Sequence, residues 1–157
     1  MTTIGIEGWV DFINEFLDRP FPSEDYRTDD ESGGPNYFRL VLSSSRDFWE
    51  DSSDEVVVPA LGAIVAELDA LATVVTARRG TAEKFNARPH VNSRFSSTCD
   101  PLPISLLHST VGDINLWRLP ETGRWLTLAI SWEDKELPFE LEALIGRIED
   151  LTTLSKP

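Results

Sequence analysis

Three apolar segments follow one another closely between residues 104 and 132. The connections between them, residues 110–113 and 120–123, are four residues long, which suits hairpins and is too short for the crossovers that join parallel strands. Residues 104–109, 114–119 and 124–132 are therefore predicted to form an antiparallel meander. In simple hairpin register, one face of this meander is apolar and carries Ile104, Leu106, Trp117, Leu119, Leu126, Leu128, Ile130 and Trp132.

The opposite face of the predicted meander is more polar, so we expect it to meet solvent. It carries Ser105, Ser109, Arg118, Trp125, Thr127 and Ser131. An exposed tryptophan on a sheet is uncommon without a binding role, which makes Trp125 a secondary contact candidate. The alternative is that a helix or the segment 81–99 covers it.

Two long segments have apolar residues three and four apart, which indicates amphipathic helices. The first predicted helix covers residues 6–18, and the second runs to residue 79, where Gly80 can cap it. The start of the second helix stays open. Ser52 and Glu55 have the spacing of a capping box, but Pro59 would then lie inside the helix, so two pieces or a start at Pro59 are alternatives.

The remaining segments complete an α+β pattern. Residues 36–43 alternate and predict a strand, 91–95 predict a short strand, and 137–151 return to helical spacing. Residues 20–35 are rich in proline, glycine and acids, which predicts a mobile acidic loop. We expect a single domain over 1–157, with a mostly antiparallel sheet of four to five strands, helices packed on one face, and a meander followed by a C-terminal helix.

The charge balance restricts the partners. The chain has 27 Asp and Glu against 14 Lys and Arg, a formal charge of −13. Nucleic acids are disfavoured as ligands, because phosphate binding needs clustered cations. The single cysteine excludes an internal disulfide, the N-terminus lacks a secretory pattern, and no segment is expected to approach the length of a membrane span. We therefore expect a cytoplasmic protein without a membrane partner.

The acidic residues gather in three clusters, within residues 24–31, 47–55 and 133–142. Two clusters contain the same tripeptide, Trp-Glu-Asp, each ahead of a predicted helix. A tryptophan beside carboxylates suits a cationic protein surface, because the ring supplies buried area and the acids steer the encounter. The alternative is that the acids complement helix dipoles and the tryptophans belong to the core. The candidate partner-binding residues are Asp29, Asp30, Glu31, Asp47, Trp49, Glu50, Asp51, Trp132, Glu133 and Asp134.

No catalytic or metal-binding motif is recognised. His90, Cys99 and His108 are nine residues apart, which suits neither a metal knuckle nor one helix face, and Asp100 disfavours a Cys99 thiolate. The basic residues between 78 and 94 are expected to pair with the chain's own acids. We therefore predict no catalytic residue, no metal and no cofactor.

These observations predict a non-catalytic acidic binding module, an inhibitor of the immunity or antitoxin type that neutralises a cationic toxin or nuclease. Two alternatives stay open. One is a secretion-type chaperone or dimeric scaffold that binds an apolar segment, so that either a monomer or a homodimer is possible. The other is an enzyme or small-ligand binder with a pocket between the sheet and the long helix, near His108, Asn115 and Arg94.

Overall fold

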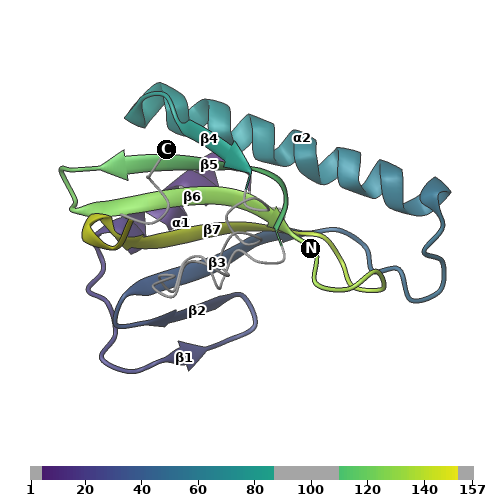
Figure 1. Ribbon diagram of the computed structural model, residues 1–157, viewed down its shortest axis with the longest axis horizontal. Helices are drawn as coiled ribbons and strands as arrows, with labels where there is room; N and C mark the ends of the chain where they lie inside the picture. The colour runs from purple at the N-terminus through teal and green to yellow at the C-terminus, as the bar shows by residue number, and fades with distance from the viewer. Residues whose placement is uncertain (1–4, 87–109, 152–157) are drawn as a thin grey trace, which may run out of the picture.

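The computed structural model describes residues 5–86 and 110–151 (Figure 1). Within them, two α-helices and seven strands are followed by a short 3-10 helix. In chain order the elements are α1 (Ile6–Asp18), β1 (Tyr26–Arg27), β2 (Glu31–Gly34), β3 (Tyr37–Ser44), α2 (Asp54–Arg79), β4 (Glu83–Asn86), β5 (Thr110–Leu119), β6 (Arg124–Ser131), β7 (Glu140–Arg147) and η2 (Ile148–Leu151).

The seven strands form one sheet in the order β1-β2-β3-β7-β6-β5-β4, with every neighbouring pair antiparallel. The predicted α+β class is confirmed. The sheet is larger than the four to five strands expected, and its centre is β7, which follows β5 and β6 in the chain but pairs with β3.

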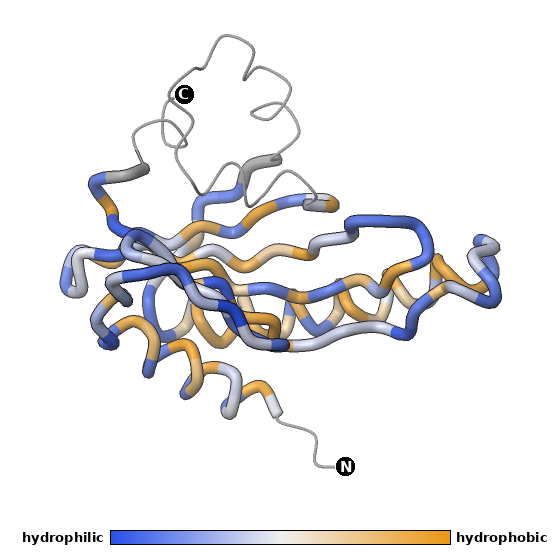
Figure 2. The backbone as a smooth tube through the Cα atoms, turned by 90° about the horizontal axis from the view of Figure 1, so that it is seen from below, coloured by the Kyte–Doolittle hydropathy of each residue, from blue (hydrophilic) through white to orange (hydrophobic). Residues whose placement is uncertain are grey.

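Both α-helices lie on the same face of the sheet (Figure 2). The helix predicted over 6–18 is confirmed as α1, and its buried side joins one side of α2 and the inner face of the sheet in a single hydrophobic core. The apolar face predicted for the meander is confirmed where the structure describes it. Its buried members are Trp117, Leu119, Leu126, Leu128 and Ile130.

The expected loop over 20–35 is wrong for its second half, which forms β1 and β2. The glycines that suggested a loop are instead required by close packing. A side chain on Gly33 would come within 2.8 Å of the Tyr26 ring and 2.9 Å of the Phe38 ring. Gly33 therefore leaves room for two aromatic rings, and Gly34 leaves room for the Asp25 carboxylate and the Tyr37 ring. These glycines serve close packing within the sheet, although glycine-rich segments are also typical of turns.

The predicted C-terminal helix over 137–151 is also wrong, because most of this segment is strand β7. Residues 141–146 are all buried, with Leu141, Ala143 and Ile145 in the core beneath the helices. A strand buried on both faces is a continuous apolar run without alternation, and such a run matches helical spacing by chance.

The long helix α2 begins at Asp54 and continues unbroken through Pro59. Ser53 is its N-cap and makes no side-chain cap, so the capping box on Ser52 is wrong. At the other end the N–H of Gly80, with φ +101°, binds the carbonyl of Thr76. By length and composition α2 is apolar enough to cross a membrane, as core helices of soluble proteins also are, so the expectation that no segment reaches that length is wrong.

The two predicted connections of the meander have different outcomes. Residues 120–123 form the turn between β5 and β6, with Gly123 at φ +72°. Residues 110–113 belong to β5, where the pairing with β6 shifts between Val111 and Asn115 and Gly112 has φ +79°. This irregularity in the pairing uses a glycine with positive φ, as a turn also does. The strands predicted over 91–95 and 104–109 lie outside the described residues.

The second face of the sheet is buried at its centre, contrary to expectation. Trp125 and Thr127 are fully buried and Ser131 is 4% exposed. Trp125 pairs with Gly146 of β7, and a side chain at Gly146 would overlap the indole ring. The proposal of Trp125 as a surface contact is therefore wrong, because its ring lies against the sheet.

Candidate functional site

The structure brings two of the three acidic clusters to one end of the sheet. Residues 45–53 lead from β3 to α2, and residues 132–139 lead from β6 to β7. Their backbones are joined where Phe48 N–H donates to the carbonyl of Glu136 at 2.9 Å and Ser45 N–H donates to the carbonyl of Phe139 at 2.8 Å. We call these two segments the paired loops, and Figure 1 shows them side by side ahead of α2.

An aromatic cluster holds the paired loops together. Phe48 contacts Phe139 at 5.6 Å between ring centroids, and Trp132 contacts Phe139 at 4.6 Å. The indole N–H of Trp132 donates to the carbonyl of Leu137 at 2.8 Å. The side chain of Trp132 is half-buried, and its indole N–H is already hydrogen-bonded within its own loop. Trp132 therefore stabilises the paired loops and offers little free surface to a partner.

Trp49 has the opposite environment. Its side chain is 63% exposed, although the adjacent Phe48 is 1% exposed. The backbone before it is fixed through Phe48, while the carboxylates of Asp47, Glu50 and Asp51 around it are exposed. In a monomer, an exposed indole leaves a large apolar surface in water and adds no stability. A tryptophan in this environment is typical of a residue that contacts a binding partner.

The carboxylates of the paired loops are mostly in solvent. Hydrogen bonds from Ser53, first from its side chain and then from its N–H at 2.9 Å, lower the pKa of the Asp51 carboxyl. Glu133 and Asp134 are exposed, and Asp134 accepts the N–H of Glu136 at 3.1 Å. At neutral pH these groups make one end of the protein anionic.

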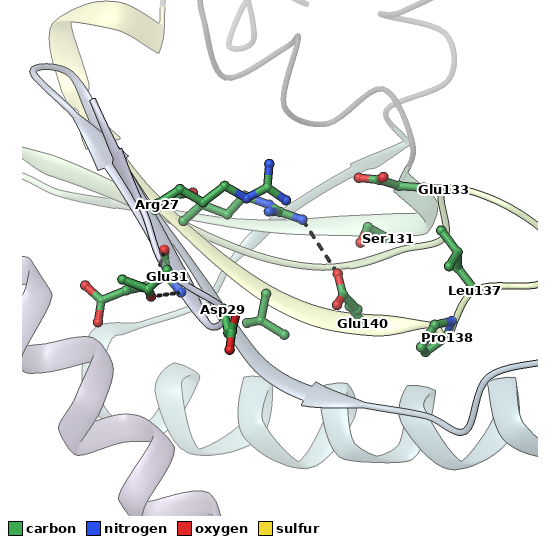
Figure 3. Close-up of a pocket in the computed structure, with 12 residues that line it drawn as sticks. Arg27, Asp29, Glu31, Ser131, Glu133, Leu137, Pro138 and Glu140 are labelled. Carbon is green, nitrogen blue, oxygen red and sulfur yellow. Dashed lines mark hydrogen bonds and ion pairs between the residues drawn. The ribbon is translucent and has the colours of Figure 1, made fainter. Parts of the chain in front are cut away.

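The first cluster meets the third in a hollow of about 170 Å³ on the face of the sheet away from the helices. Figure 3 shows Asp29 and Glu31 on one side of it and Glu133 and Glu140 on the other, and two arginines, Arg27 and Arg39, also line it. We call this site the carboxylate hollow. Asp30 is exposed but does not line it; its carbonyl accepts the N–H of Val41 at 2.8 Å.

Below the carboxylate hollow lies a buried ion pair that sequence reasoning missed. Arg39 of β3 binds Glu142 of β7, and Ser131 donates its hydroxyl to the same carboxylate at 2.9 Å. Glu142 is 3% exposed, and burial raises the pKa of its carboxyl although Arg39 opposes the shift. Arg39 also lies 3.7 Å from Glu140, so it links the buried pair to the hollow.

Glu31, which the sequence nominates as a partner-binding residue, already interacts with side chains of its own chain. It accepts a 2.6 Å hydrogen bond from the hydroxyl of Tyr26, and Arg19 lies 4.0 Å away. Burial, followed by this hydrogen bond, raises the pKa of Tyr26 to about 12. Glu31 therefore has an internal structural role in addition to lining the hollow.

We expect Glu31→Gln to lower the pKa of Tyr26 from about 12 toward its ordinary value of 10.0, because a carboxylate acceptor disfavours the phenolate. The chain has two tyrosines, so a Tyr37→Phe background leaves Tyr26 as the one reporter in an ultraviolet titration. Because the pKa is raised in the folded state, the stability that this group contributes is complete below about pH 10 and is lost toward pH 12. An unchanged titration in the Glu31→Gln variant would contradict the assignment.

The described residues give little support to a phosphate site in the basic stretch 78–94 or to a metal site. The basic side chains at the end of α2 pair with acids, Arg78 with Glu7 and Arg79 with Glu121. No three of the His, Cys, Asp and Glu side chains in the described ranges are arranged to hold a metal ion. His90, Arg94, Cys99 and His108 lie outside those ranges.

A groove of about 460 Å³ separates the end of β3 from the first half of α2. It is lined by Ser43–Arg46 and by one side of the helix, and Ser43 donates its hydroxyl to Glu67 at 2.7 Å. Asn115, which was expected to line a pocket between sheet and helix, does not belong to it. The groove is open. Its polar lining residues are Ser43, Ser44, Ser45, Arg46, Glu55 and Glu67, and this set matches no catalytic motif.

No protein-family model, no curated protein and no solved structure matches this chain significantly.

Proposed function

We propose that this protein is a non-catalytic acidic binding module of the inhibitor type, in which the paired loops hold a cationic protein partner. The observation that carries the proposal is Trp49, which is 63% exposed and stands among three exposed carboxylates. An indole of this kind supplies buried area to a complex, while the acids accelerate the encounter with a basic surface.

The rigidity of the paired loops supports the proposal. Backbone hydrogen bonds and the packing of Phe48 on Phe139 fix both loops before any partner arrives. A surface that is ordered in advance loses less conformational entropy on binding, so more of its contact energy appears as affinity.

The carboxylate hollow extends the anionic surface next to Glu133. A basic side chain of the partner would meet four carboxylates there, which outnumber the guanidinium groups of Arg27 and Arg39 in the lining. A nuclease or toxin that acts on phosphate must present such side chains around its active site, which is why the immunity or antitoxin type of inhibitor is the form we propose. A cytoplasmic location belongs to the same proposal.

The test begins with capture of the partner from native lysate at low salt, followed by binding kinetics of variants. Trp49→Ala should speed dissociation and weaken affinity at least tenfold, or about 1.4 kcal/mol, because it removes the buried anchor. Its melting temperature should stay unchanged because the side chain is exposed. An unchanged dissociation rate would remove Trp49 from the interface.

The electrostatic part is tested by reversing charge at Asp47, Glu50 and Asp51 together. Association should slow, and its dependence on salt should flatten, since these acids steer the encounter. The matched control reverses three exposed acids elsewhere, Asp11, Asp113 and Glu149, with the same change in net charge. If the control slows association equally, overall charge and not the paired loops controls the encounter.

A further inference from the structure

The charges that line the carboxylate hollow differ in whether the chain already compensates them. Arg39 is paired with Glu142 beneath the hollow and lies 3.7 Å from Glu140. Glu31 accepts a hydrogen bond from the hydroxyl of Tyr26 at 2.6 Å. Arg39, Glu140 and Glu31 therefore already have partners within the chain.

Three further charged side chains of the lining have no such partner. Arg27, Asp29 and Glu133 are exposed, and none of them forms an ion pair or a side-chain hydrogen bond with a residue of the ranges that the structure describes. Arg27 ends β1 and Asp29 follows it in the turn, whereas Glu133 comes from the loop after β6 on the other side of the hollow (Figure 3). The hollow therefore offers one cation and two carboxylates to a ligand.

The mixture of charges restricts the ligand. A purely cationic ligand would be attracted by Asp29 and Glu133 but repelled by Arg27, and for a purely anionic ligand these signs are reversed. A ligand with one carboxylate and two cationic groups matches all three side chains, because each of its charges then meets an opposite one.

The size and the apolar part of the hollow restrict the ligand further. Its volume of about 170 Å³ corresponds to about six water molecules at about 30 Å³ each. Sites for drug-sized ligands have about 300 to 1,000 Å³, so this ligand must be smaller. Val41, Leu137 and Pro138 also line the hollow, and they suit a short chain of methylene groups.

We propose that the carboxylate hollow binds a free basic α-amino acid of the lysine type. Arg27 would bind the carboxylate of the ligand and Asp29 its α-ammonium group. These two side chains are two residues apart in the chain, which suits two groups that are attached to one carbon atom. The methylene groups would lie along the apolar lining, and the terminal ammonium group would reach Glu133 on the other side.

This ligand site goes beyond the proposed function, because the amino acid needs no protein partner in order to bind. The two are connected through Glu133, which belongs both to the paired loops and to the hollow. A bound amino acid would therefore withdraw this carboxylate from a cationic partner. Trp49 and the acids around it do not line the hollow, so failure of the ligand site would leave the binding proposal for the paired loops untouched.

Isothermal titration calorimetry of the full chain with four ligands tests the match of charges. L-lysine is compared with three analogues that each lack one charge: cadaverine lacks the carboxylate, ε-aminocaproate lacks the α-ammonium group, and L-norleucine lacks the terminal ammonium group. L-lysine should bind at least about tenfold more tightly than each analogue, because each analogue leaves one side chain of the hollow without an opposite charge. Equal affinity for cadaverine, or no binding of L-lysine at millimolar concentration, would contradict the proposal.

Two variants assign the groups of the ligand to the walls of the hollow, and circular dichroism shows that both stay folded. Arg27→Gln should weaken the binding of L-lysine at least about tenfold and should not weaken that of cadaverine, which has no carboxylate. Glu133→Gln should weaken the binding of L-lysine by a similar factor and leave L-norleucine unchanged. The matched control is Lys135→Gln, which removes an exposed cation outside the hollow. If Lys135→Gln and Arg27→Gln change the affinity for L-lysine equally, overall charge and not the hollow controls binding, and the proposal is overturned.

Discussion

Replacing Glu142 by Leu should destabilise the protein by about 3 kcal/mol, because it leaves the guanidinium of Arg39 without its main partner in a half-buried place. Removing one member of a buried pair usually costs about 3 to 5 kcal/mol. We expect the lower end of this range, since Glu140 lies 3.7 Å from Arg39 and can replace part of the interaction. Urea unfolding followed by circular dichroism measures the change.

The double variant Arg39→Met with Glu142→Leu is the matched control. It removes both charges and fills the site with apolar groups of similar size, so its stability should return to that of the unmodified chain or exceed it. If the double variant is as unstable as the single one, packing rather than an unpaired charge explains the loss.

In the single variant Arg39→Met, we expect the loss of stability to depend on pH through the carboxyl of Glu142. Without the guanidinium, burial raises the pKa of Glu142 still further above the ordinary glutamate value, because Arg39 is what lowers it now. A group whose pKa is raised in the folded state adds stability at low pH and loses it as the pH rises. The deficit of Arg39→Met relative to the unmodified chain should therefore shrink as the pH falls from 7 toward 4.5.

Replacing Trp125 by Ala should destabilise the protein by about 3 to 5 kcal/mol, the usual cost of removing a large aromatic side chain from a packed interior. Trp125 is fully buried and its ring covers Gly146 of the neighbouring strand. Among the described residues its indole N–H has no hydrogen-bond partner, so Trp125→Phe should cost much less than the alanine variant.

The chain provides its own control for this experiment in Trp49. The same substitution at Trp49 removes a side chain of the same size that is 63% exposed, so thermal unfolding should change little. Equal losses for the two variants would contradict the placement of one ring inside and the other outside.

The helices could largely be predicted from the sequence, because each one has its buried apolar residues on one side and this gives a helical spacing. The segment 6–18 alternates between buried and exposed residues at helical spacing and was assigned correctly. The segment 137–151 was not, because β7 is central and buried on both faces, so its pattern has no strand period. That one error also concealed the ion pair of Arg39 with Glu142, which depends on the pairing of β7 with β3 across 103 residues.

The candidate site was predictable in composition but not in geometry. The repeated tripeptides identified Trp49 and Trp132 as equivalent, yet one is exposed and the other packs on Phe139. The difference arises from partners far away in the sequence, since Phe139 belongs to a loop that residues 45–53 contact only in the folded chain. The same holds for the carboxylate hollow, which combines Asp29 with Glu133.

The short strand β1 has a consequence for solubility. An edge strand presents unpaired backbone groups, to which strands of other molecules can add during aggregation. At this border of the sheet β1 has only two residues, Tyr26 and Arg27, and one of them is a cation. A template of that length gives an incoming strand very few hydrogen bonds, so this side of the molecule resists uncontrolled growth into fibres.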